Sequence, residues 1–530
     1  MNMRFDLSSH LGKEIFNSLR SAPFQPYLLD YGLPKVKSFR RGFVLALSLL
    51  FSKDFKVFPL GSRVGVILPP GIAGFITNFA LLLSGRVPVN LNFTMGKELN
   101  LEVLQGAGVT TVVTASKMMK KFSEFPWPEN CILVDDFFNR MANNPFLILR
   151  TFIKAWIFPS STIKEFEIPQ HGGTDLAVLI FTSGSSGKPK GVRLTHANLL
   201  ANCGQLYDLE LFEDQSKVLV NLPLFHSFGF TVGMLFSTLR GLCPVTSPSP
   251  LDHKLNLKII TEQKVKILLG TPTFLRGYLK KAKKGELKSI QFVVAGAEKS
   301  PQTFRDRWER EAHCQYLEGY GLTETSPAIS FNLPGAGKKN GSVGRLLPDV
   351  ECQTIDPESG CITPLEEGGI LCFRGPNIFA GYWQDAEHSN KVLDENGWFK
   401  TGDLGRLDGD GFLWIEGRSS RFSKIGGEMV PHGRVEEEII ELLEICQTED
   451  PMVVVCSLEN DQKGETLIVL SSFNCDLNQI KKGLKDKGLP NLWIPKELLI
   501  VKEIPILPTG KFNWLKIRSI VASRSKAEIE

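Results

Sequence analysis

The stretch AVLIFTSGSSGKPKG, residues 177–191, joins a short apolar run to a loop rich in glycine, hydroxyl groups and lysine. The apolar run predicts a buried strand, and the glycines after it let the backbone bend tightly and present N–H groups to phosphate oxygens. The hydroxyls add donors and the lysines add positive charge. The stretch therefore predicts a polyphosphate cradle, whose residues are Thr182, Ser183, Gly184, Ser185, Ser186, Gly187, Lys188 and Lys190.

This cradle differs from the P-loop of nucleoside triphosphatases. In a P-loop the lysine is followed by a Ser or Thr that binds magnesium, whereas Pro189 follows Lys188 here. A flexible linker is the alternative, but lysines interleaved with glycine directly after a buried strand favour the cradle.

Apolar β-rich runs alternate with helical stretches over the first ~400 residues, a pattern typical of βαβ units and a largely parallel sheet. From about residue 341, Gly, Pro and Asp become frequent, and the alternating run 369–374 predicts a small antiparallel barrel or sheet. The last ~110 residues have the size of a separate α+β domain. Strands are predicted at 63–68, 88–91, 217–220, 266–269 and 292–295, and a helix at 72–84.

The composition argues against several classes of protein. The net charge of +4 over 530 residues is too small to indicate nucleic-acid binding, and the intermixed charges predict a solvated surface. The ten cysteines include no pair with the two-residue gap of a zinc or thioredoxin-like site, and the eight histidines form no metal-ligand pattern. We expect reduced cysteines in a cytosolic protein.

No apolar run reaches the ~18–20 residues that a membrane span needs, and no signal-peptide core is present near Met1. Residues 146–158 are apolar but include Arg150 and Lys154. They predict either a helix at a membrane surface or a helix on the domain core whose two cations reach solvent. The core helix is favoured, because isolated amphipathic signals are usually core faces.

Two further segments carry residues suited to nucleotide chemistry. In residues 319–325, Tyr320 can stack on a base, and Glu324 is a hard oxygen ligand suited to magnesium. In residues 398–405, Asp403 can accept both hydroxyls of a ribose, although an Asx-turn is the alternative.

The last two segments lie towards the end of the chain. Gly417 and Arg418 are followed shortly by residues 424–427, which include two glycines. Lys511, held in a turn with Pro508 and Gly510, can bring a cation to a reacting carboxylate and phosphate. An exposed surface lysine is the alternative for Lys511 taken alone.

Together the five segments, in this order, resemble the adenylate-forming superfamily of acyl-CoA synthetases, peptide-synthetase adenylation domains and luciferases. The resemblance extends from about residue 61 to residue 511, with further matches at 223–226, 296–298 and 374–377. It implies an α/β fold: a large N-terminal region, residues 1–419, of two doubly wound subdomains plus a small distorted β-barrel. A small mobile α+β domain, residues 420–530, would follow.

The resemblance also implies a role for each matching residue, with ATP and Mg²⁺ as cofactors. The loop 182–190 would hold the β- and γ-phosphates, Glu324 would bind Mg²⁺, and Thr323 would touch the α-phosphate. His226 would lie at the acyl pocket, although an ordinary core histidine is the alternative, and Lys511 would stabilise the adenylation transition state. The other implied residues are Gly296, Ala297, Glu298, Tyr320 and Gly321 at the adenine, Asp403 and Arg418 at the ribose, and Lys424, Gly426 and Gly427 at a thiol tunnel.

The implied reaction has two halves. A carboxylate attacks the α-phosphorus of ATP and expels pyrophosphate, while the loop, Mg²⁺ and Lys511 offset the developing charge. A thiol then attacks the mixed anhydride and releases AMP, after a rotation of the C-terminal domain has withdrawn Lys511 and brought residues 424–427 to the thiol. The hinge position of the family is usually Asp or Lys, and here it is Ser420.

The expected acid is a long-chain fatty acid. Amino-acid-activating members of the superfamily carry an Asp directly after the Phe that matches Phe225, and here that position is His226. Residues 225–233 offer no carboxylate and several aromatic side chains, so an unpaired ammonium would be costly to desolvate. An apolar chain fits better, since each buried CH₂ contributes ~0.8 kcal/mol.

The expected thiol acceptor is acyl carrier protein, with coenzyme A as the alternative. Residues 421–430 and 224–229 look most like the synthetase half of the bacterial 2-acylglycerophosphoethanolamine acyltransferase/acyl-[acyl-carrier-protein] synthetase. Lysines at 280–284 and 481–482 could steer an acidic carrier protein, although such runs are more often solvated faces. The expected enzyme is a fatty acid–[acyl-carrier-protein] ligase, or else the corresponding CoA ligase.

Proteins of other classes are the remaining alternatives. A catalytically silent adenylate- or fatty-acid-binding protein would be expected to have lost Lys511 or Glu324, and both are present. A membrane-surface partner of an acyltransferase is suggested by residues 146–158 alone. The expected location is the cytoplasm, with peripheral contact at the inner face of the membrane as a further alternative.

Overall fold

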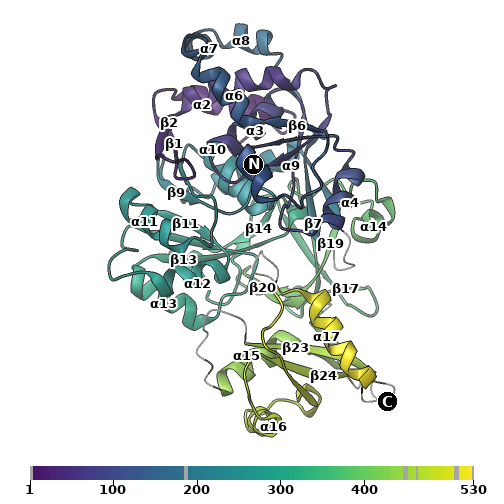
Figure 1. Cartoon of the computed structure of the whole chain (residues 1–530). Helices are drawn as coiled ribbons and strands as arrows, with labels where there is room; N and C mark the ends of the chain where they lie inside the picture. Colours follow the sequence, from purple (N-terminus) through teal and green to yellow (C-terminus); the bar gives the residue numbers. More distant parts are fainter. Residues whose placement is uncertain are drawn as a thin grey trace. The chain divides into compact units, whose positions relative to one another are not determined.

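The computed structural model describes residues 4–183, 189–418, 421–425, 428–443, 445, 452–460, 464–506 and 512–527 (Figure 1). The chain divides into two compact units. One is Met1–Glu351 with Phe373–Phe399, and the other is Cys352–Cys372 with Lys400–Glu530. The predicted domain boundary falls on residues 419–420, which lie outside the described residues.

The larger sheet of the first unit contains nine described strands in the order β15-β14-β13-β12-β11-β9-β10-β1-β2. The six strands from β13 to β1 in this order run parallel, and antiparallel strands complete both edges. Parallel strands are apolar throughout because helices cover both faces of such a sheet. The bounds are β1 (Pro26–Asp30), β2 (Lys37–Arg40), β9 (Lys217–Val220), β10 (Cys243–Thr246), β11 (Ile267–Gly270), β12 (Phe292–Ala295), β13 (Gln315–Gly321), β14 (Ala328–Phe331) and β15 (Arg345–Leu346).

A second sheet of the first unit has the order β4-β3-β5-β6, and its strands are all parallel. The cradle segment forms the antiparallel hairpin of β7 (Leu176–Ser183) and β8 (Pro189–Thr195). The strands and the helix predicted from apolar runs between residues 63 and 91 are confirmed. The bounds are β3 (Arg63–Ile67), β4 (Val87–Asn90), β5 (Thr111–Thr114), β6 (Asn130–Leu133) and α3 (Ile72–Leu83).

The helices of the first unit pack on these sheets. Figure 1 shows α11, α12 and α13 along the larger sheet, and the core between them includes the fully buried Tyr278, Trp308 and Tyr316. The remaining bounds are α1 (Leu11–Ser21), α2 (Arg41–Ser52), α4 (Lys97–Ala107), α5 (Ser116–Lys121), α6 (Val134–Ala142), α7 (Pro145–Ile157), α8 (Pro159–Phe166), α9 (His196–Tyr207), α10 (Ser237–Arg240), α11 (His253–Gln263), α12 (Pro272–Lys281), α13 (Gln302–Ala312) and α14 (Ala386–Val392).

Most of a five-stranded sheet, in the order β17-β16-β18-β19-β20, belongs to the second unit. A hairpin, a three-stranded sheet and three helices follow it along the chain. The predicted mixed α/β fold, with a large N-terminal and a smaller C-terminal domain, is confirmed. The bounds are β16 (Glu351–Ile355), β17 (Ile362–Thr363), β18 (Gly369–Arg374), β19 (Phe399–Leu407), β20 (Leu413–Arg418), β21 (Phe422–Ile425), β22 (Glu428–Pro431), α15 (His432–Leu442), β23 (Val453–Asn460), β24 (Gly464–Ser471), α16 (Leu477–Asp486), β25 (Glu497–Ile500) and α17 (Trp514–Ala527).

Two histidines are buried against each other where α1 begins beside α9. His10 caps α1 by accepting a hydrogen bond from the backbone N–H of Gly12 (3.1 Å), and His196 accepts one from that of Leu11 (3.1 Å). Their ring centroids are 3.8 Å apart. Burial lowers the pKa of His10 to about 4 and that of His196 to about 2, where His10 adds to the effect. Both imidazoles are therefore neutral in the folded chain at neutral pH.

The free energy of unfolding should fall as the pH drops from about 6.5, the pKa of an unfolded histidine, towards about 4. In this window the unfolded chain binds protons that the folded His10 and His196 do not accept, at a cost of up to about 1.4 kcal/mol per pH unit for each histidine. Replacing both by Asn, which keeps a hydrogen-bond acceptor, should flatten the dependence measured by chemical denaturation. The exposed His313→Asn variant serves as the control, and an unchanged slope in the double variant would contradict this assignment.

Candidate functional site

Several predicted site residues of the first unit follow strands at one edge of the larger sheet. The strands β9, β12 and β13 run parallel, so their carboxyl ends meet at the same edge. His226 follows β9, Gly296 follows β12, and Glu324 follows β13. In open α/β sheets, ligands bind in the crevice outside the carboxyl ends of the strands.

Gly296 lies at the carboxyl end of β12, beside β13. In the sheet Ala295 pairs with Glu318, which places Gly296 beside Gly319. A Cβ on Gly296 would lie 3.6 Å from the carbonyl oxygen of Gly319 and 3.7 Å from the ring of Phe228. These are ordinary van der Waals distances, so packing alone does not require glycine at this position.

The turn that follows Gly296 is fixed by hydrogen bonds on two sides. The Oε2 atom of Glu298 accepts from the hydroxyl (2.7 Å) and the backbone N–H (3.2 Å) of Thr273, which follows β11. The backbone N–H of Ser300 donates to Glu318 (3.1 Å), whose carboxylate pairs with Arg305 (2.9 Å). Since both members of this pair are buried, removing either would leave an unpaired charge in the core.

Thr323 and Glu324 lie on one 3₁₀ turn, η3 (Thr323–Thr325), directly after β13. The hydroxyl of Thr323 is 3.3 Å from that of Ser227, so the loop after β9 meets the turn after β13. At Gly321 a Cβ would overlap with the carbonyl group of Pro327. That close approach explains why glycine ends β13.

Residues 377–383, here called the strap, hold the Glu324 turn from another direction. The side-chain amide of Asn377 donates to the carbonyl of Thr325 (3.0 Å), and the backbone N–H of Phe379 donates to that of Glu324 (2.9 Å). The phenol of Tyr382 donates to Oε1 of Glu324 (2.9 Å). Burial raises the pKa of Tyr382, and the Glu324 carboxylate raises it further, so the phenol keeps its proton.

The strap also pairs with β8, the strand that follows the cradle loop. The backbone N–H of Trp383 donates to the carbonyl of Gly191 (2.7 Å), and that of Ala380 to the carbonyl of Arg193 (3.0 Å). The ammonium of Lys190 lies 5.2 Å from the centroid of the Tyr382 ring, within cation–π range. Tyr382 therefore contacts both a lysine of the cradle and the Glu324 carboxylate.

His226 begins a different kind of element. Its ring is 4.7 Å from that of Phe225, which in turn lies 5.3 Å from Phe93. A π-helix, η2 (Phe228–Phe236), follows it; π-helical turns are rare and often occur at functional sites. At Gly229 a Cβ would overlap with the carbonyl of Pro223, so glycine lets the helix start against this loop.

Thr182 and Tyr320 complete the predicted residues of the first unit. Thr182 is the penultimate residue of the apolar strand β7 and pairs with Lys190 across the hairpin. Tyr320, near the end of β13, pairs with Ser330 in the sheet, and its ring lies 6.1 Å from that of Phe373. The structure thus brings together Thr182, Lys190, His226, Gly296, Ala297, Glu298, Tyr320, Gly321, Thr323 and Glu324 in one unit.

The other predicted residues belong to the second unit, have only their backbone described, or lie outside the described residues. Asp403 is buried in β19 of the second unit, where it pairs in register with Arg418. For Ser183, Arg418 and Lys424 only the backbone is described. The predicted residues that lie outside the described residues are Gly184, Ser185, Ser186, Gly187, Lys188, Ser420, Gly426, Gly427 and Lys511.

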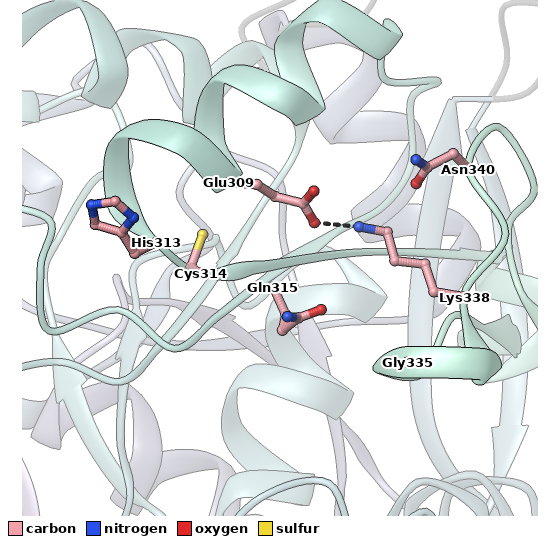
Figure 2. A pocket seen from close by; sticks show the side chains of 7 residues that line it. All are labelled: Glu309, His313, Cys314, Gln315, Gly335, Lys338 and Asn340. Carbon is pink, nitrogen blue, oxygen red and sulfur yellow. Dashed lines mark hydrogen bonds and ion pairs between the residues drawn. The ribbon is translucent and has the colours of Figure 1, made fainter.

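Two hollows lie on the surface of the first unit. Figure 2 shows one of about 630 Å³, crossed by an ion pair between Lys338 and Glu309. Its wall includes Gln315, the first residue of β13, so it lies at the opposite end of this strand from Tyr320. A hollow of about 1030 Å³ runs along the strap and includes Tyr382.

A buttressed carboxylate at the edge of a parallel sheet, together with a hairpin that flanks a Ser/Gly-rich loop, is typical of a nucleotide-binding enzyme. The chain belongs to the AMP-binding enzyme family, whose model matches residues 59–383. A long-chain-fatty-acid–CoA ligase of Bacillus subtilis is 29% identical over 490 residues, which cover 85% of this chain and 84% of the relative. A second long-chain-fatty-acid–CoA ligase, from Salmonella typhimurium, is 26% identical over 490 residues, which cover 86% of this chain and 85% of the relative.

The fold matches solved structures across nearly the whole chain. The o-succinylbenzoate CoA synthetase of Bacillus subtilis, in complex with its acyl-adenylate intermediate, superposes with a TM-score of 0.79 at 22% identity. The match covers 95% of this chain and 97% of that one.

The sequence pattern gave no sign of Tyr382 or of the π-helix. Residues 374–377 matched the family, but the bond from Tyr382 to Glu324 joins residues 58 positions apart and follows from the folded arrangement alone. The run 228–236 is apolar with two glycines, which predicts burial without specifying the type of helix.

The Tyr382→Phe variant should lower the rate of adenylate formation roughly tenfold, because hydrogen bonds to charged groups contribute about 1.5–3 kcal/mol. Phe keeps the ring that contacts Lys190 and removes only the donor to Glu324. ATP–pyrophosphate exchange measures the rate, and the requirement for Mg²⁺ should rise in parallel. Tyr207→Phe, which removes a surface hydroxyl bonded to Arg4, is the matched control; equal rates in the two variants would refute the role of Tyr382.

Proposed function

We propose that this chain uses ATP to activate a long-chain fatty acid as its acyl-adenylate and then transfers the acyl group to the thiol of coenzyme A, releasing pyrophosphate and AMP. The observation that carries the proposal is the Glu324 carboxylate, held by Tyr382 beside Lys190 at the carboxyl edge of the parallel sheet. A cation and a metal-binding carboxylate at fixed positions suit a polyphosphate.

Mg²⁺ fits this edge through Glu324. Among the described residues, no group of three or more His, Cys, Asp or Glu side chains could hold a metal by itself. Mg²⁺ is usually held by one or two carboxylates together with substrate phosphates and water, which agrees with one oriented carboxylate beside a phosphate cradle. When bound, the ion would neutralise charge on the phosphates, and Tyr382 would fix one oxygen of its ligand.

The remaining roles are proposed for the residues that match the family's motifs. Thr323 contacts the α-phosphate, and Gly296, Ala297, Glu298 and Tyr320 surround the adenine with Gly321 beside them. Asp403 and Arg418 bind the ribose, and Lys511 stabilises the transition state of adenylation. Lys424, Gly426 and Gly427 form the thiol tunnel after rotation of the C-terminal domain. Ser420, a small polar residue, absorbs that rotation at the hinge.

An apolar acyl chain is supported by the side chains around His226. Phe225 and Phe93 form an aromatic contact there, and the π-helix that follows buries Phe230, Met234 and Leu235. His226 stands where amino-acid-activating members have an Asp, so a substrate ammonium would lose its hydration without gaining a partner. Two relatives that match more than four-fifths of this chain are named long-chain-fatty-acid–CoA ligases.

For the thiol acceptor, the sequence analysis put acyl carrier protein first and coenzyme A second, and we propose the opposite order. Residues 421–430 favoured acyl carrier protein, but two relatives that cover 85% and 86% of this chain are named long-chain-fatty-acid–CoA ligases. Acyl carrier protein is the second candidate, and its support is the lysine pair on α16, half-buried Lys481 and exposed Lys482, together with that motif. A cytoplasmic location is part of the proposal, since both acceptors and ATP are cytoplasmic.

The Lys511→Ala variant should abolish adenylate formation and leave thiol transfer from a supplied acyl-adenylate largely intact, because this cation acts on the first transition state alone. Gly427→Leu should have the opposite effect by blocking the thiol. Pyrophosphate release and thioester formation from synthetic adenylate measure the two halves. Equal loss of both half-reactions in Lys511→Ala would overturn the division of labour.

A competition experiment identifies the acceptor. ATP, Mg²⁺, palmitate and equal amounts of coenzyme A and holo-acyl carrier protein are mixed with the enzyme, and both thioesters are measured by mass spectrometry. We expect acyl-CoA to predominate. The Lys481→Glu/Lys482→Glu variant is the control. If the native enzyme loads acyl carrier protein preferentially, and the variant loses only this loading, the second candidate is established instead.

A further inference from the structure

Exposed apolar side chains are concentrated on α7 and the residue that follows it. Of the sixteen large apolar side chains that are exposed among the described residues, seven fall within residues 146–158, and the others are scattered. Their exposure ranges from 37% at Leu147 to 76% at Phe146. We call these seven the α7 surface: Phe146, Leu147, Leu149, Ile153, Trp156, Ile157 and Phe158.

The opposite face of α7 already packs on the first unit. Ile148, Thr151 and Ala155 are buried, and Phe152 reaches α2 at Gly42, where a Cβ would overlap with its ring. Figure 1 shows α7 and α8 at the rim of the unit, next to α2 and α6. The core helix favoured from the sequence is thus confirmed for one face of α7.

The outward face of α7 is as apolar as the buried one. At 100° per residue, Phe146, Leu149 and Ile153 fall on the side opposite Ile148 and Ala155. A helix that is apolar all round is normally buried on all sides. Large contiguous apolar patches on a protein surface mark sites of contact with a protein or a membrane.

Charge distinguishes between these occupants. The only charged residues of α7 are the cations Arg150 and Lys154. Lys154 pairs with Glu165 of α8, whereas Arg150 is exposed among the apolar side chains and has no ion-pair partner in the described part of the chain. An unpaired cation within an aromatic and aliphatic surface complements phosphate headgroups above an acyl layer.

We infer that the outward face of α7 lies on an anionic lipid bilayer, with its aromatic and aliphatic side chains at the boundary of headgroups and acyl chains and Arg150 at the phosphates. The helix lies in the plane of the interface, since none of the described helices is long and apolar enough to cross a membrane. Phe24, which is exposed and makes an edge-on contact with Trp156 (5.0 Å), extends the inserted surface beyond α7.

Vesicle flotation of the full chain tests this inference, with phosphatidylcholine vesicles that do or do not contain phosphatidylglycerol. The native protein should float with the anionic vesicles. The Ile153→Glu/Trp156→Glu variant should bind them at least roughly tenfold more weakly, because it replaces two inserted apolar side chains. Arg150→Gln should lower binding to anionic vesicles about fivefold and leave the weaker binding to neutral vesicles unchanged.

Leu251→Glu is the matched control, because Leu251 is exposed to 58% but lies outside the α7 surface. Native protein that stays unbound, or a double variant that floats like the control, would overturn the inference. Sedimentation velocity tests whether a second copy of the chain covers this face instead. If the native protein does not bind lipid but forms a dimer that the double variant abolishes, the face belongs to a dimer interface. Ligase activity is not the readout, so failure here leaves the proposed function unaffected.

Discussion

The hydrogen bond from Tyr382 to Glu324 links the strap to the turn after β13. Together with the backbone pairing of the strap with β8, it joins three segments of the first unit that lie far apart in the sequence. The strap pairs with β8 through its backbone and reaches the turn after β13 through the phenol. Because the strap also contacts Lys190 of β8, the position of this lysine is coupled to the position of the carboxylate. A shift of either would break bonds to the strap, and burial of Tyr382 would then leave its hydroxyl without a partner.

Backbone contacts impose the second constraint, and they explain where glycine is required. A side chain at Gly321 would displace the turn that carries Glu324, and one at Gly229 would displace the start of the π-helix. The two elements are themselves linked through Ser227 and Thr323. Small residues at this edge therefore allow the loops after β9 and β13 to approach each other, so that one ligand can contact both.

The strands of the sheets could be predicted from local sequence patterns. The contacts of Tyr382 that hold Glu324, and the π-helix after His226, could not. Apolar runs such as 217–220 and 292–295 became β9 and β12, since a strand buried on both faces has little choice of composition. Gly296 and Glu324 follow the strands β12 and β13, whereas Lys190 lies within β8 of a separate hairpin, so the strand pattern alone does not bring the three together. Tyr382 escaped notice because a buried tyrosine in a loop resembles any core aromatic, and its partner is decided by long-range packing. The π-helix escaped because hydrophobic periodicity does not distinguish helix types over nine residues.

Two apolar features of the first unit, independent of each other, suit the same class of substrate. The side chains of Phe225, Phe93 and the π-helix provide aromatic and aliphatic contacts beside His226, which suit a hydrocarbon chain. The α7 surface, within residues 146–158, is separate in sequence from the side chains around His226. A long-chain acid resides mainly in bilayers, since each of its CH₂ groups favours leaving water by about 0.8 kcal/mol. An enzyme that works at the bilayer surface meets this substrate where its concentration is highest. Access to the substrate would therefore explain the exposed apolar face of α7, which packing within the chain does not explain.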